Sequence, residues 1–131
     1  MIFVDTSVWY AANVEEDPDH FKSRELVLQA TSELITTDYV IDELLTLLSA
    51  RGQRDVAVRI GEDFWTGTTC DLEWTKEEDI WSAWRVFTSF DDKTWSFTDC
   101  VSYAVMKRLG ITEAFAVDDD FKQFEFVVVK P

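Results

Sequence analysis

Four acidic residues of this chain each border an apolar segment, and they are the side chains best suited to do chemistry: Asp5, Glu43, Asp99 and Asp118. Asp5 and Asp118 each follow a short apolar run, so both are expected at the carboxyl end of a strand. Glu43 borders the apolar stripe of a predicted helix, and Asp99 begins another helix. Because ligands of open parallel sheets bind beyond the carboxyl ends of the strands, one α/β fold can bring these carboxylates together.

A cluster of carboxylates requires a cation. Two of them ~4 Å apart repel by about 4 kcal/mol at an effective dielectric constant of about 20, so three or four cannot stay ionised together without a counterion. Mg²⁺ and Mn²⁺ favour such hard oxygen ligands. A bound divalent ion activates a water molecule and stabilises charge on a phosphoryl oxygen. The four acids therefore predict an Mg²⁺ or Mn²⁺ site that hydrolyses phosphodiester bonds.

Each of the four acids also has an ordinary structural explanation. Asp5 can simply end a strand, and Asp99 can be the acidic member of a Ser96-x-x-Asp99 helix cap. Glu43 can be solvated at the edge of its apolar stripe, and Asp118 can be one of three consecutive acids in a turn. It is the joint placement of the four that favours a metal site.

Length and residue types exclude several other kinds of site. The chain of 131 residues fits a single domain, 1–131, and it has no run approaching the ~20 apolar residues of a membrane span and no leader pattern, so we expect a cytoplasmic protein. His20 is the one histidine, which excludes a two-histidine ribonuclease mechanism. Cys70 and Cys100 form no CxxC pair, so we expect two reduced thiols and no zinc site.

The charge of the chain is strongly negative. Its formal net charge is -14, from 26 acidic and 12 basic residues, and this would repel a nucleic-acid backbone unless the basic residues are grouped. Candidate backbone contacts are Arg51, Arg54, Arg59, Lys107 and Arg108. Solvated helix faces, and favourable charges near helix carboxyl termini, explain the same residues equally well.

Apolar periodicity predicts strands that alternate with helices. Strands are expected at residues 2–5, 34–37, 68–72, 114–117 and 126–129. Helices are expected after a cap at Thr6 or Ser7, through residues 26–30, from a cap at Asp38 to about Gly52, at 53–65, at 76–89, and from Asp99 to Gly110. This order predicts a mostly parallel sheet covered by helices on both faces. Trp81 and Trp84 share a helical stripe with Ile80 and Phe87, which favours core or subunit packing over base stacking.

Four motifs in this order resemble those of PIN-domain ribonucleases, and most closely of the VapC-type toxins of prokaryotic toxin-antitoxin pairs. They are Phe3-Val4-Asp5-Thr6-Ser7-Val8-Trp9, Asp38-Tyr39-Val40-Ile41-Asp42-Glu43-Leu44, Phe97-Thr98-Asp99-Cys100-Val101-Ser102-Tyr103-Ala104-Val105-Met106 and Ala116-Val117-Asp118-Asp119-Asp120-Phe121. The likeness runs essentially from end to end. Each motif alone is of low specificity, whereas the ordered set is specific.

The resemblance implies a three-layer α/β/α PIN-like fold and a metal-dependent endoribonuclease that uses Mg²⁺ or Mn²⁺ and cleaves single-stranded RNA. It also implies a homodimer, inhibited by a small antitoxin protein bound near the acidic pocket. Under this mapping Asp5, Glu43, Asp99 and Asp118 are the catalytic, metal-binding carboxylates, and the Thr6 hydroxyl supports them. Asp120 is the alternative to Asp118 as the fourth acid. The marked acidity departs from what an RNA-binding enzyme needs, but it suits an antitoxin with a basic segment.

Three other functions fit parts of the sequence. A catalytically weak PIN-like module that acts mainly through antitoxin binding is the main alternative. A phosphoaspartyl hydrolase would use Asp5 as its nucleophile, but Ser7 stands where a second aspartate is expected. A phosphoaspartate receiver domain would need a lysine at the end of a late strand, and Lys130 comes too late for that role.

Overall fold

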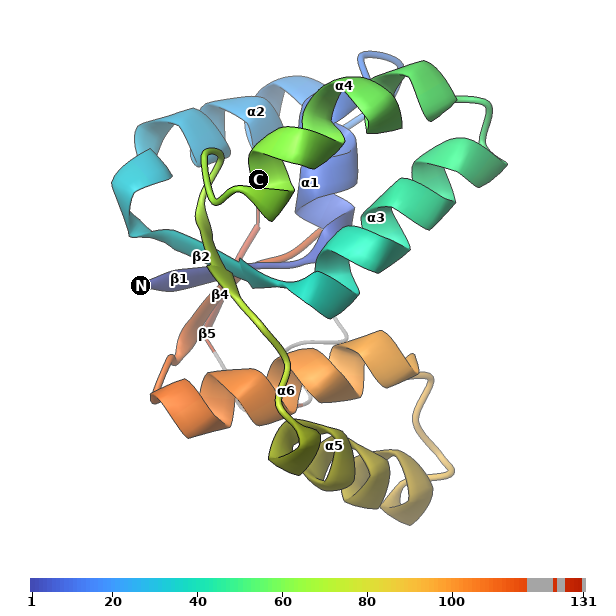
Figure 1. Ribbon diagram of the computed structural model, residues 1–131, viewed down its shortest axis with the longest axis vertical. Coiled ribbons are helices and arrows are strands. Elements are labelled where there is room, and N and C mark those ends of the chain that lie inside the picture. The colour runs from blue at the N-terminus through green and yellow to red at the C-terminus, as the bar shows by residue number, and fades with distance from the viewer. Residues whose placement is uncertain (118–123, 125–126, 131) are drawn as a thin grey trace.

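Five parallel strands form the centre of the structure, in the order β3-β2-β1-β4-β5 (Figure 1). The computed structural model describes residues 1–117, 124 and 127–130. The strands are β1 (Ile2–Val4), β2 (Leu34–Thr37), β3 (Asp71–Glu73), β4 (Glu113–Phe115) and β5 (Val127–Val129). Each neighbouring pair is parallel, and β1 lies in the middle between β2 and β4. The predicted parallel sheet is confirmed, and the carboxyl ends of its strands share one edge.

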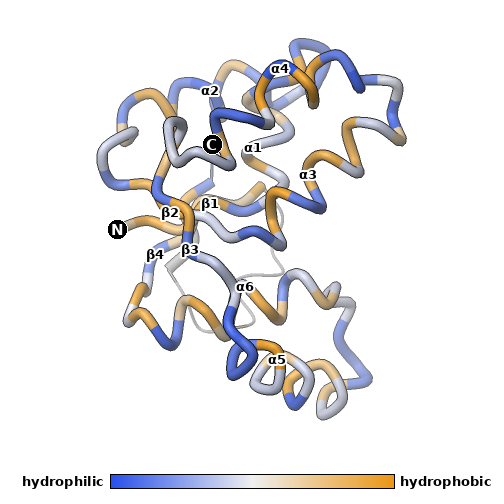
Figure 2. Tube along the Cα trace, in the orientation of Figure 1, coloured by the Kyte–Doolittle hydropathy of each residue, from blue (hydrophilic) through white to orange (hydrophobic). Residues whose placement is uncertain are grey.

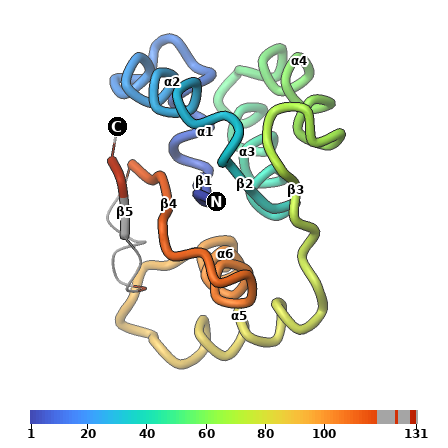
Figure 3. The backbone as a smooth tube through the Cα atoms, turned by 90° about the vertical axis from the view of Figure 1, so that its left-hand side faces the viewer, coloured from blue at the N-terminus to red at the C-terminus, as the bar shows by residue number. Residues whose placement is uncertain are grey.

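The helices cover both faces of this sheet. They are α1 (Thr6–Asn13), α2 (His20–Gln29), α3 (Asp38–Ala50), α4 (Arg54–Trp65), α5 (Glu77–Ser89) and α6 (Phe97–Leu109), with a 3₁₀ turn η1 (Thr31–Glu33) before β2. Figures 1 and 3 show α1 to α4 on one side of the sheet and α5 and α6 on the other. The three-layer α/β/α fold is therefore confirmed. No helix in the described part of the chain combines the length and the apolar composition needed to cross a membrane.

Two apolar clusters hold the three layers together. The cluster on the side of α1 to α4 contains Phe3 and Val4 of the central strand, both fully buried, and the apolar stripe of α3. The cluster on the other side is built mainly from α6, with Val101 and Val105 fully buried. Figure 2 shows apolar residues along β1 and β2 and recurring on α3 and α4. Burying each large aliphatic side chain contributes roughly 1.5–3 kcal/mol, so both faces of the sheet are stabilised.

Two helix caps differ from the sequence prediction by one residue. Asp5, and not Thr6 or Ser7, is the N-cap of α1, and Thr37, and not Asp38, is the N-cap of α3. The Thr37 hydroxyl accepts a hydrogen bond from the Val40 amide at 3.2 Å. Thr37 is the last residue of β2, and Asp5 is the single residue between β1 and α1, so in both cases the cap lies at the junction of strand and helix.

The third strand begins later than predicted. β3 spans Asp71–Glu73, whereas the sequence pattern favoured 68–72. The Asp63 carbonyl accepts hydrogen bonds from the amides of Thr68 and Thr69, and Gly67 has a φ of 74°. These contacts form a turn after α4. Gly67 permits this turn, because glycine adopts such a φ without strain.

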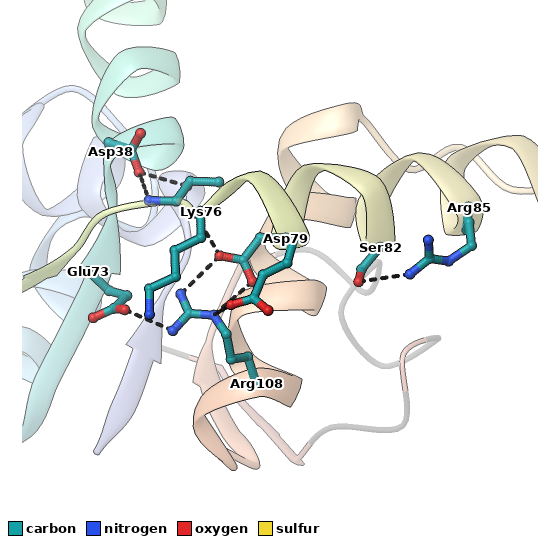
Figure 4. Close-up of polar contacts among 9 residues, drawn as sticks. Asp38, Glu73, Lys76, Asp79, Ser82, Arg85 and Arg108 are labelled. Carbon is teal, nitrogen blue, oxygen red and sulfur yellow. Dashed lines mark hydrogen bonds and ion pairs between the residues drawn. The ribbon is translucent and has the colours of Figure 1, made fainter.

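One ion-pair network ties α6 to the start of α5 and to the end of β3 (Figure 4). The Arg108 guanidinium donates to both carboxylate oxygens of Asp79, at 2.8 and 2.9 Å, and to Glu73 at 3.0 Å. Asp79 is only 2 % exposed, and it also accepts from the Lys76 amide at 2.9 Å. Burial raises the pKa of Asp79, but the hydrogen bonds and charge of Arg108 and the Lys76 amide outweigh it, and the net pKa is lowered. Arg108 is thus a structural residue and is not free to contact a nucleic-acid backbone as the sequence suggested.

We expect Asp79→Asn to lower the free energy of unfolding by about 3 kcal/mol at neutral pH, because it breaks a buried, bidentate pair. Folding holds the pKa of Asp79 below its ordinary 3.8, so its contribution is present above that value and is lost as pH falls through the folded-state pKa. Urea unfolding of both proteins at a series of pH values measures this. Glu78→Gln is the control, because Glu78 is 68 % exposed and 4.0 Å from Arg108; an equal loss in this variant would contradict the assignment.

Candidate functional site

Asp5 lies where the central strand turns into the first helix. Its amide donates to the Phe115 carbonyl of β4 at 3.0 Å, which continues the sheet hydrogen bonding by one residue. Its carboxylate caps α1 and accepts from the Ser7 amide at 3.4 Å and the Ser7 hydroxyl at 2.8 Å. The side chain is 3 % exposed. Asp5 is therefore held in one position by the sheet on one side and by the helix on the other.

The Ser7 hydroxyl joins the first strand-helix junction to the chain that leaves β4. It donates to Asp5 and accepts from the Val117 amide at 3.1 Å. Asp118 directly follows Val117 in the sequence. Asp118 and the alternative Asp120 lie outside the described residues. The Ser7 hydroxyl nevertheless bridges the Asp5 carboxylate and Val117, the residue before Asp118.

Thr6 supplies a further oxygen beside Asp5. Its side chain is 4 % exposed, and within the described residues its hydroxyl has no hydrogen-bond partner. A buried hydroxyl without a partner costs roughly 1–3 kcal/mol of desolvation. The supporting role that the sequence resemblance implies for Thr6 stays a prediction.

Glu43 lies on α3 and is partly exposed. Tyr39 is four residues earlier on α3, so both side chains share one face of the helix. The Tyr39 ring lies 6.2 Å from the ring of Phe97, the first residue of α6. Figure 1 shows the N-terminal halves of α3 and α6 on the side of the molecule where the strands end.

Asp99 has a structural role as well as a predicted chemical one. Its carboxylate accepts from the Ser96 amide at 3.1 Å, and its own amide donates to the Ser96 hydroxyl at 3.1 Å. This is the Ser96-x-x-Asp99 capping box that the sequence suggested as an ordinary explanation, and it is confirmed. The cap uses Oδ2 of Asp99 and fixes the carboxylate at the start of α6.

The structure places Asp5, Glu43 and Asp99 at or on helices that contact one another, since α1 packs against α3 and α3 against α6. Asp5, Ser7 and Val117 are joined by hydrogen bonds, and α3 and α6, which carry Glu43 and Asp99, meet at their first turns. Among residues 1–117, 124 and 127–130, no three Asp, Glu, His or Cys side chains are close enough to form a metal-binding group. Convergence of all four acids stays a prediction. The donors themselves, carboxylates and the Thr6 hydroxyl, are the hard oxygen ligands that Mg²⁺ and Mn²⁺ favour.

The other reactive groups of the chain are held in inert states. Burial, and then the neighbouring Asp99 carboxylate, raise the pKa of Cys100 to about 11. Burial, followed by Asp71, raises the pKa of Cys70 to about 12. Both thiols are free and buried, as expected from the sequence. The ring of His20 is 9 % exposed and its Nδ1 lies 2.8 Å from the Ala11 carbonyl, a structural contact. Carboxylates remain the chemically available groups.

Sequence reasoning missed Ser7, which it treated only as a possible cap. The signal was present, because a serine two residues after an N-cap aspartate can donate to that aspartate. Its second contact, to the Val117 amide, joins residues 110 positions apart and has no local sequence signal.

Comparison with known proteins identifies close relatives. The family model for the PIN domain matches residues 2–127. The 23S rRNA-specific endonuclease VapC20 of Mycobacterium tuberculosis is 34% identical over 131 residues, which is 100% of this chain and 99% of that protein. The crystal structure of M. tuberculosis VapC20, described as a sarcin-ricin loop cleaving toxin, superposes with a TM-score of 0.92 at 33% identity and covers 100% of both chains.

A more distant relative supports the fold alone. VapBC2 from Rickettsia felis, solved bound to a DNA fragment from its promoter, matches with a TM-score of 0.69 at 12% identity. The match covers 100% of this chain and 99% of that one. The same arrangement of layers is therefore compatible with very different sequences.

We expect Ser7→Ala to destabilise the fold by about 2 kcal/mol, because it removes a charge-assisted hydrogen bond to Asp5 and leaves the Val117 amide without its acceptor. Ser23→Ala is a matched control, since the Ser23 hydroxyl is fully buried and lacks a hydrogen-bond partner in the described part of the chain. Chemical denaturation measures both. Equal free energies of unfolding for Ser7→Ala and Ser23→Ala would contradict the linking role of Ser7.

Proposed function

The chain belongs to the PIN-domain family, and on that premise we propose that it is a metal-dependent endoribonuclease, the toxin of a toxin-antitoxin pair. The observation that carries this proposal is 34% identity over the whole chain to a ribosomal RNA endonuclease. The position of Asp5 supports it independently, since this buried carboxylate directly follows the central strand of the sheet.

In this proposal Asp5, Glu43, Asp99 and Asp118 hold Mg²⁺ or Mn²⁺, with Asp120 as the alternative fourth acid. When bound, the divalent ion supplies a positive charge that neutralises the carboxylates and polarises the phosphodiester and an attacking water molecule. Ser7 orients the Asp5 carboxylate, Ser96 orients Asp99, and the Thr6 hydroxyl is assigned the supporting role. The protein thus keeps its acidic oxygens fixed before the substrate arrives, and this preorganisation lowers the cost of reaching the transition state.

The substrate class is RNA, and ribosomal RNA of the 23S type is the first to test. The support is the specificity stated for M. tuberculosis VapC20, which this chain matches over its whole length. A cytoplasmic location accompanies this proposal, because ribosomal RNA is cytoplasmic.

A small antitoxin with a basic segment is the proposed protein partner. The formal net charge of -14 supports a basic partner, because opposite charges accelerate association and favour the complex. If the protein binds an antitoxin but does not cleave RNA, the function is that of a catalytically weak PIN-like module that acts through antitoxin binding.

A homodimer is the proposed assembly, and an exposed aromatic surface on α5 supports it. The α5 aromatic surface comprises Trp81, Trp84 and Phe87, which are 56%, 47% and 42% exposed. The rings of Trp84 and Phe87 stack at 5.9 Å, and each also contacts Phe97. Figure 1 shows α5 on the outside of the molecule, beyond α6. Core packing, one of the two sequence explanations for Trp81 and Trp84, is therefore wrong, and subunit packing remains.

We expect Asp5→Asn to reduce Mg²⁺- or Mn²⁺-dependent RNA cleavage by about two orders of magnitude or more, because it removes a charge that the metal needs. Glu43→Gln should act in the same direction. The matched control is Asp42→Asn, which changes an exposed acid next to Glu43. Cleavage of 23S rRNA is measured by primer extension, with metal chelation as a second control.

Metal binding is tested separately by protein stability. Mg²⁺ at about one hundred times its dissociation constant should raise the free energy of unfolding of the wild type and of Asp42→Asn by about 2.7 kcal/mol. The same ion should leave Asp5→Asn nearly unchanged. Full activity of Asp5→Asn in both assays would remove the assigned site.

We expect Trp84→Ser to weaken the homodimer by at least tenfold, because truncating a buried interface tryptophan costs about 2 kcal/mol or more. Trp74→Ser is the control, since Trp74 is 59% exposed and its ring stacks on Trp65 of α4, 5.7 Å away. Light scattering over a concentration series measures both. A wild-type protein that stays monomeric, or a Trp84→Ser dimer as tight as the wild type, would contradict this assembly.

A further inference from the structure

Arg51 is the C-cap residue of α3, the helix that carries Glu43. Glu43 and Leu47 are four residues apart on one side of α3, and Arg51 follows Leu47 by four more residues. Eight residues of helix correspond to about 12 Å along the axis. The guanidinium carbon of Arg51 lies 4.9 Å from the centroid of the Tyr10 ring on α1, a cation-π contact that fixes its direction.

A small pocket joins Arg51 to the candidate site. The pocket has a volume of about 180 Å³, and Arg51, Leu47 and Tyr10 line it together with Ser7 and Val117. Ser7 is the residue that donates to Asp5, and Val117 is the residue before Asp118. The pocket therefore borders the residue that binds Asp5 and the residue before Asp118, and Arg51 places a cation there.

We propose that Arg51 binds a backbone phosphate of the RNA strand next to the phosphodiester that is cleaved, and so positions the strand. This inference rests on the proposed function. The separation of about 12 Å along α3 makes Arg51 a positioning residue, because its guanidinium contacts the strand beside the reacting phosphate and not the reacting atoms. A guanidinium is suited to this role because it binds phosphate oxygens with two parallel hydrogen bonds.

The other arginines named from the sequence are less suited. Arg108 is already bonded to Asp79 and Glu73. Arg54 and Arg59 lie on α4 and line two other cavities, neither of which includes Asp5, Ser7 or Glu43. Within the described residues, no ion pair within 4.0 Å involves Arg51. Its charge is therefore available to a phosphate.

Two carboxylates face Arg51 across the same pocket, those of Asp17 and Asp19. Asp17 accepts a hydrogen bond from the Asp19 amide at 2.8 Å, which commits part of its carboxylate. The side chain of Asp19 makes no cap hydrogen bond to α2. Both acids oppose an anion in the pocket, so removing one should strengthen the phosphate contact that Arg51 makes.

The test is equilibrium binding of a sarcin-ricin loop RNA oligonucleotide to metal-free protein in a chelator, over a range of salt concentrations. We expect Arg51→Met to weaken binding about tenfold and to make the slope of log K against log salt shallower by about 0.7, the value for one lost contact to a single-strand phosphate. Arg51→Lys should keep the slope, and Asp19→Asn should bind more tightly than the wild type. Arg54→Met is the control and should change neither quantity.

The salt slope separates phosphate binding from a structural role. If Arg51 only stabilised the packing of α1 against α3, Arg51→Met would lower the thermal stability and leave the slope unchanged. An unchanged slope in a folded Arg51→Met protein overturns the inference. The binding assay contains no metal, so it decides the role of Arg51 independently of cleavage. Failure of the wild type to cleave RNA with Mg²⁺ or Mn²⁺ would overturn the proposed function alone.

Discussion

The position of β1 at the centre of a parallel sheet is the constraint on which the site depends. β1 is hydrogen-bonded to β2 on one side and to β4 on the other, and both Phe3 and Val4 are fully buried. A strand held on two edges and two faces cannot slip without exposing its apolar residues, so its last residue is fixed relative to both neighbours. That residue leads directly into Asp5, and the Asp5 amide extends the pairing to Phe115. The carboxylate is therefore placed by the packing of the whole domain.

Two of the predicted metal ligands, Asp5 and Asp99, also cap helix N-termini. Asp5 caps α1, Asp99 closes the cap of α6, and Glu43 lies in the first half of α3. The positive end of a helix dipole stabilises a nearby carboxylate by about 0.3–1 kcal/mol, and each cap also satisfies amides that would otherwise lack a partner. This offsets only part of the repulsion among several carboxylates. The same residues can therefore stabilise the helices and leave a residual negative potential for a divalent ion.

The sequence predicts the parts of this structure that depend on local pattern. Apolar runs and 3.6-residue periodicity predict the strands and helices, and Ser96-x-x-Asp99 predicts its cap. The pattern does not resolve which residue caps a helix that begins as soon as a strand ends, as at Asp5 and Thr37. It also does not reveal the ion pair of Asp79 and Arg108. The two residues are 29 positions apart, and a local sequence pattern relates only residues that are close in the chain. The exposure of Trp81 and Trp84 depends on how α5 packs against α6, so a helical stripe alone could not distinguish core from surface.

A formal net charge of -14 changes how an RNA-binding site must work. Over most of its surface such a protein repels a phosphate backbone, so non-specific electrostatic attraction contributes little to RNA binding. Each cation near the site therefore contributes more of the RNA affinity than it would in a basic enzyme. Arg108 is removed from that role by Asp79 and Glu73. In the proposed function, the remaining attraction comes from a metal ion at the carboxylates and from a few cations near them. The same field attracts a basic protein segment, and association with such a partner becomes faster as salt falls. One charge distribution therefore weakens binding to a nucleic acid in general and strengthens binding to a basic inhibitor, which is the balance that a tightly controlled nuclease requires.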